Sequence, residues 1–139
     1  MKAPRYLFLL LTITGFLSSC SKEKNFTTAP AIVGRWMSTA VYTEQNGQFN
    51  WLETNSFREF VTFFPDARFA IFTDVPGGTG TYIYNNQARS IRLQFKDAAG
   101  GNVAVEERSV EDISKEKLVV AFFSSQGELV NKISYRKVD

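Results

Sequence analysis

The chain has 139 residues, a formal net charge of +2, and 44% hydrophobic and 14% aromatic residues, which fits one domain with a substantial apolar core. It contains no histidine and a single cysteine, so histidine acid–base chemistry, an internal disulfide and any multi-cysteine metal centre are excluded. The nearly balanced charge gives no sign of nucleic-acid binding.

Residues 1–19 have the features of a secretory signal. Lys2 and Arg5 precede an apolar run at positions 6–17, which is shorter than the roughly 20 apolar residues of a membrane-spanning helix. The segment ends in Leu17-Ser18-Ser19-Cys20, which resembles the lipobox of bacterial lipoproteins.

This resemblance implies that Cys20 is acylated, becomes the first residue of the mature protein and holds it at a membrane by lipid. Ser21, the residue after Cys20, resembles the sorting signal of outer-membrane lipoproteins. This resemblance implies a location at the outer membrane, either on its periplasmic face or at the cell surface. The alternative is an ordinary signal peptide with a chance cysteine. Removal of residues 1–19 takes away two of the 16 basic residues and none of the 14 acidic ones, so the mature formal charge is zero.

A tether and a series of short strands follow. Residues 21–31 are mostly small, polar or charged, which predicts a flexible tether. From residue 32 onward, β-branched and aromatic runs between turn residues predict a single all-β domain, residues 32–139, with eight antiparallel strands. The expected strands are residues 32–44, 57–64, 67–74, 79–84, 89–96, 102–110, 116–124 and 128–137.

The eight strands are expected to close into a barrel. The alternation of apolar and polar residues is clearest at Ile91, Leu93 and Phe95, and it predicts one buried and one solvated face. Eight short antiparallel strands leave exposed edges unless the sheet closes, so an up-and-down β-barrel is favoured over a sandwich. A barrel of this size is either filled by side chains or holds one small ligand.

Gly34-Arg35-Trp36, at the start of the first strand, resembles the G-x-W motif of lipocalins. This resemblance implies a lipocalin-like (calycin-type) barrel in which Gly34 lets the chain cross the closed end and Trp36 plugs the floor. It also implies that Arg136 stacks on that tryptophan. Residues 63–69 are similar to a hairpin of small bacterial lipocalin-like lipoproteins.

The end of the barrel opposite Trp36 is expected to form a mouth, with residues 45–56 as its longest loop. Alternation counted from Trp36 predicts an aromatic lining with few polar groups, which is typical of a small-molecule site. The candidate ligand-binding residues are Tyr42, Trp51, Phe57, Glu59, Thr73, Tyr82, Phe95, Glu107 and Phe122. The 13 phenylalanines either line a pocket or fill the barrel, and a β-bulge would turn Glu59 or Glu107 outward.

The two glutamates have no nucleophile, metal-ligand set or phosphate-binding loop beside them in the sequence. We therefore expect no catalytic activity, no metal and no cofactor. The leading hypothesis is a membrane-anchored lipocalin-like lipoprotein that binds a small apolar or amphipathic ligand. The alternatives are a protein-interaction module of the cell envelope (an accessory subunit or an inhibitor) with a filled barrel, and a purely structural surface lipoprotein.

Overall fold

The computed structural model describes residues 31–54, 58–73 and 76–138 of the chain, apart from the side chain of Pro76. The expected lipidation site Cys20, the expected tether up to residue 30 and the candidate ligand contact Phe57 lie outside the described residues. Among the residues that the structure describes, no helix is long and apolar enough to cross a membrane.

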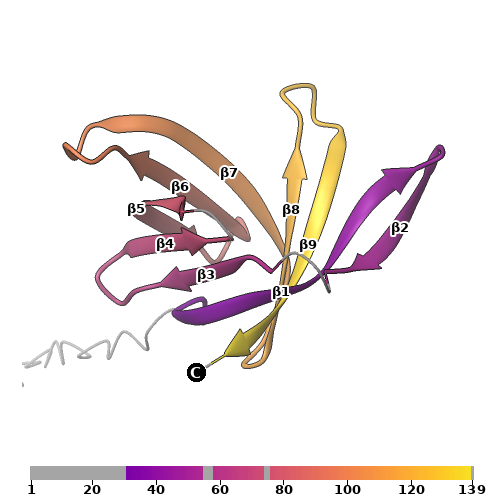
Figure 1. Ribbon diagram of the computed structural model, residues 1–139, viewed down its shortest axis with the longest axis horizontal. Coiled ribbons are helices and arrows are strands. Elements are labelled where there is room, and N and C mark those ends of the chain that lie inside the picture. Colours follow the sequence, from indigo (N-terminus) through magenta and orange to yellow (C-terminus); the bar gives the residue numbers. More distant parts are fainter. Residues whose placement is uncertain (1–30, 55–57, 74–75, 139) are drawn as a thin grey trace, which may run out of the picture.

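The described chain forms one antiparallel sheet that closes into a barrel (Figure 1). Its strands are β1 (Gly34–Gln45), β2 (Gln48–Glu53), β3 (Phe60–Phe63), β4 (Arg68–Phe72), β5 (Pro76–Asn85), β6 (Ser90–Lys96), β7 (Asn102–Ile113), β8 (Lys117–Phe123) and β9 (Leu129–Val138). The strand order is β2-β1-β3-β4-β5-β6-β7-β8-β9, and β1 also pairs with β9. This last pairing closes β1 and β3–β9 into a ring, so the predicted eight-stranded antiparallel barrel is confirmed.

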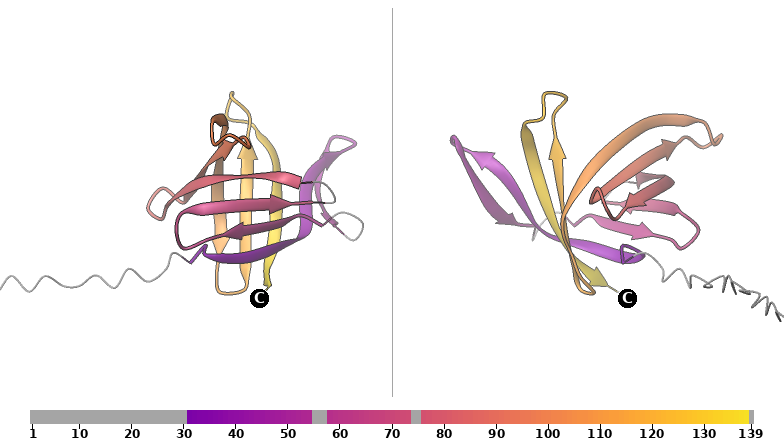
Figure 2. Two further views of the ribbon diagram at one scale, coloured as in Figure 1. Left: turned by 60° about the vertical axis from the view of Figure 1, so that its left-hand side comes forward. Right: turned by 180° about the vertical axis from the view of Figure 1, so that it is seen from behind.

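Strand β2 lies outside the ring because one edge of β1 pairs with two different strands, β3 and β2. β9 pairs along one edge of β1, and the other edge pairs first with β3, over residues 34–37, and then with β2, over residues 40–45. The second half of β1 therefore leaves the barrel together with β2. This hairpin, residues 40–53, is called the arm below, and it diverges from the barrel wall in all views (Figures 1 and 2).

The arm replaces the long loop that was expected at residues 45–56, so that prediction is wrong. The chain turns at Asn46-Gly47, where φ is 53° and 79°. Two successive residues with positive φ form a type I′ turn, whose twist matches that of the two flanking strands. The local sequence thus favours a tight hairpin over an irregular loop.

A β-bulge near the base of the arm reverses the faces of β1. The β1–β9 register shifts between Ser38 and Ala40, where Thr39 is the extra residue. One extra residue turns every following side chain to the opposite face. Tyr42 consequently lies opposite Lys132 on the outer face, and its predicted place in the barrel lining is wrong.

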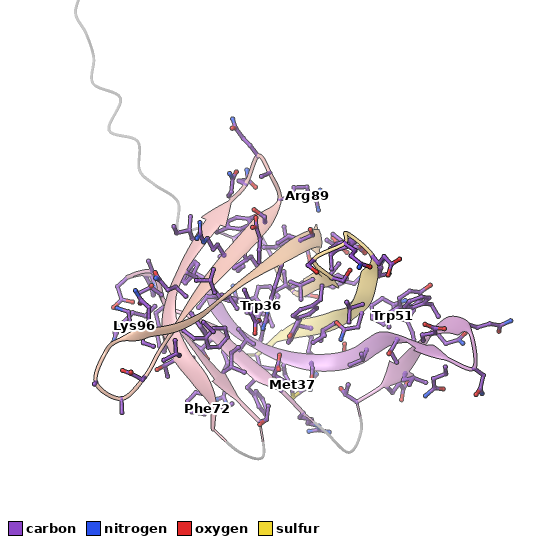
Figure 3. The ribbon with its side chains drawn as sticks, turned by 90° about the horizontal axis from the view of Figure 1, so that it is seen from above. Trp36, Met37, Trp51, Phe72, Arg89 and Lys96 are labelled. Carbon is purple, nitrogen blue, oxygen red and sulfur yellow. The ribbon has the colours of Figure 1, made fainter. Side chains whose placement is uncertain are left out.

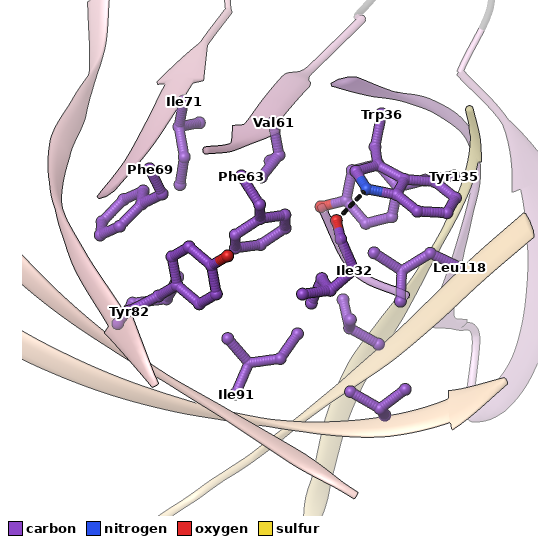
Figure 4. Packing of buried hydrophobic residues seen from close by; sticks show 13 residues of the cluster. Ile32, Trp36, Val61, Phe63, Phe69, Ile71, Tyr82, Ile91, Leu118 and Tyr135 are labelled. Atoms are coloured by element: carbon purple, nitrogen blue, oxygen red, sulfur yellow. Dashed lines mark hydrogen bonds between the residues drawn. The ribbon is translucent and has the colours of Figure 1, made fainter. Parts of the chain in front are cut away.

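Apolar side chains from all eight barrel strands fill the half of the barrel that contains Trp36 (Figure 4). Aromatic rings meet edge to face there, with centroids 4.9 Å apart for Phe63 and Tyr82 and 5.0 Å apart for Phe69 and Phe95. The predicted inward face of β6 is confirmed. The cluster consists of Ile32, Trp36, Val61, Phe63, Phe69, Ile71, Tyr82, Ile91, Leu93, Val110, Leu118, Val120 and Tyr135.

Candidate functional site

Trp36 closes one end of the barrel, called the floor below. Its side chain has no exposed surface, and its indole Nε1 donates a hydrogen bond of 2.8 Å to the carbonyl oxygen of Ile32. The Nζ atom of Lys137 lies 5.3 Å from the centre of the Trp36 ring and donates a 2.8 Å hydrogen bond to the carbonyl oxygen of Val33. Trp36 is thus fully buried at the position where the lipocalin resemblance predicts a floor plug.

The cation on the tryptophan is Lys137, and the prediction that Arg136 stacks there is wrong. Side chains alternate along a strand, and Tyr135 is buried inside, so Lys137 also faces inward while Arg136 is exposed on the outside. Gly34 has a φ of 138°, and a Cβ atom there would lie 2.4 Å from Cε of Lys137. Gly34 therefore leaves the space through which the lysine reaches the ring.

Four polar side chains lie above the floor and form what we call the polar layer: Glu59, Arg108 and Tyr135, and at its edge the exposed Glu106. The Tyr135 hydroxyl donates a hydrogen bond to Oε1 of Glu59, which confirms the predicted inward direction of this glutamate. Arg108 is only 6% exposed, and its Nη2 lies 2.9 Å from Oε2 of Glu106. Burial raises the pKa of the Tyr135 hydroxyl well above its ordinary value, and the negative charge of Glu59 raises it further, whereas Arg108 lowers it.

The barrel is filled between the floor and the polar layer. The void there has a volume of about 10 Å³ and is lined by Arg108, Tyr135 and apolar side chains. A cavity of this size is at or below the limit for a single water molecule. In this part of the barrel, Phe63, Phe69 and the aliphatic side chains of the core fill the interior and leave no room for a ligand.

Above the polar layer, the interior side chains are less tightly enclosed. The guanidinium carbon of Arg108 lies 4.6 Å from the centre of the Phe122 ring. Asn131 is the cross-strand neighbour of Phe122 on β9, so both side chains point inward. Phe95 and Ile133 are half-buried and pack against the edge of the core. We call this region, with Arg108 at its base, the upper barrel.

The upper barrel contains one unusual polar atom. Oδ1 of Asn131 is buried and has no hydrogen-bond partner among the described residues. Buried polar atoms are nearly always hydrogen-bonded, so such an atom calls for an explanation. An amide oxygen accepts hydrogen bonds only, and this site therefore fits a bound molecule or a water that offers an N–H or O–H group.

Among the candidate residues, Phe95 and Phe122 are half-buried at the edge of the core, on β6 and β8, whereas Tyr82 lies elsewhere. Tyr82 is buried beside the β3–β4 turn at the floor end, where its hydroxyl donates a 3.0 Å hydrogen bond to the carbonyl oxygen of Phe64. Burial raises the pKa of Tyr82, and Asp66 adds to the shift. Thr73 is half-buried directly after β4.

The predicted inward placement of Glu107 is also wrong. Because side chains alternate along β7, the same error would place the buried Arg108 on the outer face. The β6–β7 register shifts between Phe95 and Lys96, which reverses the faces of β7 relative to simple counting. Glu107 is exposed, and Val105 is 51% exposed on the same outer face. The valines of β7 were a misleading signal, because the open-end half of this strand carries its apolar side chains outside.

Trp51 lies on the arm and not over a mouth. It is 47% exposed, and its ring centre is 5.2 Å from that of Tyr42, which also stacks on Phe49 at 5.4 Å. Seen from above, Trp36 lies inside the barrel and Trp51 lies far out on the arm (Figure 3). Tyr42 and Trp51 therefore belong to an outer aromatic cluster, separate from the upper barrel.

The described residues include no group of three or more histidine, cysteine, aspartate or glutamate residues that could hold a metal ion.

A comparison of the chain with protein-family models found no match, and a comparison with curated proteins also found none. The observed fold is a closed eight-stranded antiparallel barrel, which is compatible with a ligand-binding calycin-like module.

Proposed function

We propose that this protein binds one small amphipathic molecule in the upper barrel, with a hydrogen-bond donor of the molecule directed at Asn131. The observation that carries the proposal is the buried Oδ1 atom of Asn131, which has no hydrogen-bond partner among the described residues. A molecule with an N–H or O–H group satisfies this atom, and leaving it unsatisfied costs about 1–3 kcal/mol.

The surroundings of Asn131 support an apolar body on the same molecule. Phe122, its cross-strand neighbour, and Ile133, two residues along β9, offer half-buried apolar surface beside it. The charged groups below are already paired, Arg108 with Glu106 and Glu59 with Tyr135. The polar layer therefore acts as a base on which the molecule rests, and its apolar part stays above this layer because the interior beneath is filled.

The lipobox resemblance at residues 17–20 supports a second part of the proposal, that the protein is a lipoprotein of the outer membrane anchored through acylated Cys20. In the full chain, Cys20→Ala is expected to move the protein from the membrane fraction to the soluble fraction. An unchanged membrane fraction would refute the anchor and leave the binding proposal untouched.

A matched pair of probes tests the binding site. N-phenyl-1-naphthylamine is an apolar fluorophore with one N–H donor, and its N-methyl derivative lacks that donor. With the chain that begins at residue 21, we expect the first probe to bind saturably. Its binding free energy should be about 1 kcal/mol more favourable than that of the second probe, which corresponds to a roughly fivefold lower Kd.

Two substitutions of asparagine by leucine provide the control. Asn131→Leu removes the acceptor and is expected to abolish the difference between the probes, whereas Asn50→Leu, on the exposed arm, should preserve it. The absence of saturable binding by the unsubstituted chain would contradict the proposal, as would a difference between probes that survives in Asn131→Leu.

The arm favours a second candidate function, a protein-interaction module of the cell envelope. Phe49, Trp51 and Leu52 present partly or largely exposed apolar surface on a hairpin that diverges from the barrel. Exposed apolar clusters of this kind often mark contacts with other proteins. Failure of both probes to bind would leave this candidate as the better explanation.

A further inference from the structure

We propose that the arm joins two copies of this chain, through antiparallel pairing of β2 with β2 of a second copy. The proposal does not depend on a ligand in the upper barrel. It begins from an edge: in the described part of the chain, β2 pairs with β1 alone, so its other edge has no strand partner.

The geometry of the hairpin shows which backbone groups face this edge. A two-residue turn makes its flanking residues, Gln45 and Gln48, a hydrogen-bonded pair. Alternation then directs the backbone groups of Asn50 and Leu52 toward β1, in agreement with the 3.1 Å hydrogen bond from Thr54 N to the carbonyl oxygen of Thr39. The N–H and C=O groups of Phe49 and Trp51 consequently point away from β1 and are available to another strand.

This edge has none of the features that usually prevent strand pairing. Natural edge strands are blunted by lysine, proline, bulges or inward charges. Residues 48–52 read Gln-Phe-Asn-Trp-Leu, with no charge and no proline, and the β1–β2 register contains no bulge. Glu53 is the first charged residue of the strand and stands at its end.

The sequence of β2 is complementary to itself in one register. If a two-fold axis passes through Asn50, Phe49 of each copy lies opposite Trp51 of the other, and Gln48 lies opposite Leu52. Aromatic cross-strand pairs are among the more stabilising pairs in a sheet. Phe49 and Trp51 also lie on the face that carries Tyr42, so the joined sheet has six aromatic side chains on one face and leaves both Glu53 carboxylates outside the paired segment.

Two Asn50 residues would then face each other as a pair without mutual backbone hydrogen bonds, at a Cα–Cα distance of about 4.5 Å. This distance suits a disulfide. We therefore propose Asn50→Cys in the full chain, oxidised in membranes of cells that produce it and examined on non-reducing gels. The expected result is several-fold more cross-linked dimer than from Gln126→Cys, an exposed position in the β8–β9 turn that reports random collision.

The register provides an internal control. Gln48→Cys and Leu52→Cys should each give no more dimer than Gln126→Cys when produced alone, and should cross-link to each other when the two chains are produced together. Adding Trp51→Pro removes an N–H from the free edge and should abolish the Asn50→Cys cross-link. Equal cross-linking by Asn50→Cys and Gln126→Cys would overturn the proposal, and so would a strong cross-link from Gln48→Cys alone.

Discussion

Two tryptophans mark the two regions of the molecule that differ most. Trp36 has no exposed surface and donates a hydrogen bond to Ile32 at the floor, whereas Trp51 is 47% exposed on the arm and contacts Tyr42. Both lie in a strand pair that includes β1. The edge of β1 meets β3 near Trp36 and the sheet closes, but along the arm it meets β2, whose other edge has no strand partner in the described part of the chain. Closure of the sheet therefore decides which tryptophan is buried.

The largest expected effect comes from truncating each tryptophan in turn. Trp36→Ala should lower the free energy of unfolding by about 3–5 kcal/mol, because it empties a large, fully buried site. Trp51→Ala should cost only about 1 kcal/mol, the value of an exposed aromatic contact. Urea unfolding of the chain that begins at residue 21 measures both values. Equal losses would show that the arm contributes to the core as much as the floor does.

Two glycines provide the same comparison for the backbone. Gly34→Ala places a residue at a φ of 138° and displaces Lys137 from Trp36, so strain and the lost cation contact should together cost roughly 2–4 kcal/mol. Gly47→Ala in the arm turn has a φ of 79° and open space around it, so only backbone strain of about 1 kcal/mol is expected. Thermal or urea unfolding compares the two. If Gly34→Ala costs no more than Gly47→Ala, the space for Lys137 is unimportant.

Tyr135 makes the polar layer sensitive to high pH. Burial and Glu59 raise the pKa of its hydroxyl in the folded protein above its ordinary value of 10.0, so above about pH 10 the unfolded chain releases a proton that the folded chain keeps. The contribution of Tyr135 protonation to the free energy of unfolding is therefore fully present below pH 10. It decreases as the pH rises further, by up to about 1.4 kcal/mol per pH unit.

Tyr135→Phe isolates this effect. It should cost about 1–3 kcal/mol at neutral pH, because Glu59 loses its hydrogen bond, and it should flatten the decrease in stability between pH 10 and 11. Urea unfolding at a series of pH values measures both changes. Tyr42→Phe, on the outer face, serves as the control and should retain the slope. An identical slope in Tyr135→Phe and the unsubstituted chain would show that Tyr135 does not cause the pH dependence.

The sequence predicted the barrel because most of its strands have clear alternation and because turn residues separate them. Counting from Trp36 gives an inward Glu59, in agreement with its hydrogen bond to Tyr135, because the β1–β3 register contains no bulge. The expected strands 32–44 and 57–64 leave residues 45–56 as a loop, and the resemblance makes that loop part of a mouth. The strong hairpin signal at Asn46-Gly47 instead accounts for the arm.

The errors in the candidate site have one common physical cause. Register shifts leave an extra residue at Thr39 in β1 and at Val103 in β7, and each reverses the inward face of its strand. The amino-acid composition does not reveal such bulges. Tyr42 and Glu107 were therefore assigned to the interior and Arg108 to the exterior. The lack of a hydrogen-bond partner for Oδ1 of Asn131 depends on three-dimensional packing, which alternation along a strand does not describe.

The smallest expected effect distinguishes the two cations near the C-terminus. Lys137→Met retains the apolar stem but removes the charge over Trp36 and the hydrogen bond to Val33, so a loss of about 1–2 kcal/mol is expected. Arg136→Met lies on the exposed outer face and should change stability by less than about 0.5 kcal/mol.

Each of the two methionine variants should then be combined with Trp36→Phe, which keeps a ring at the floor. The interaction energy between positions 36 and 137 should be measurable in urea unfolding, whereas that between positions 36 and 136 should be close to zero. Coupling of Trp36 to position 136, and not to position 137, would support the stacking of Arg136 implied by the lipocalin resemblance. Arg136 would then face the interior, and alternation along β9 would turn Tyr135 and Asn131 outward. Because the proposed ligand contact at Asn131 depends on that same face, this measurement at the floor also tests the orientation of the upper barrel.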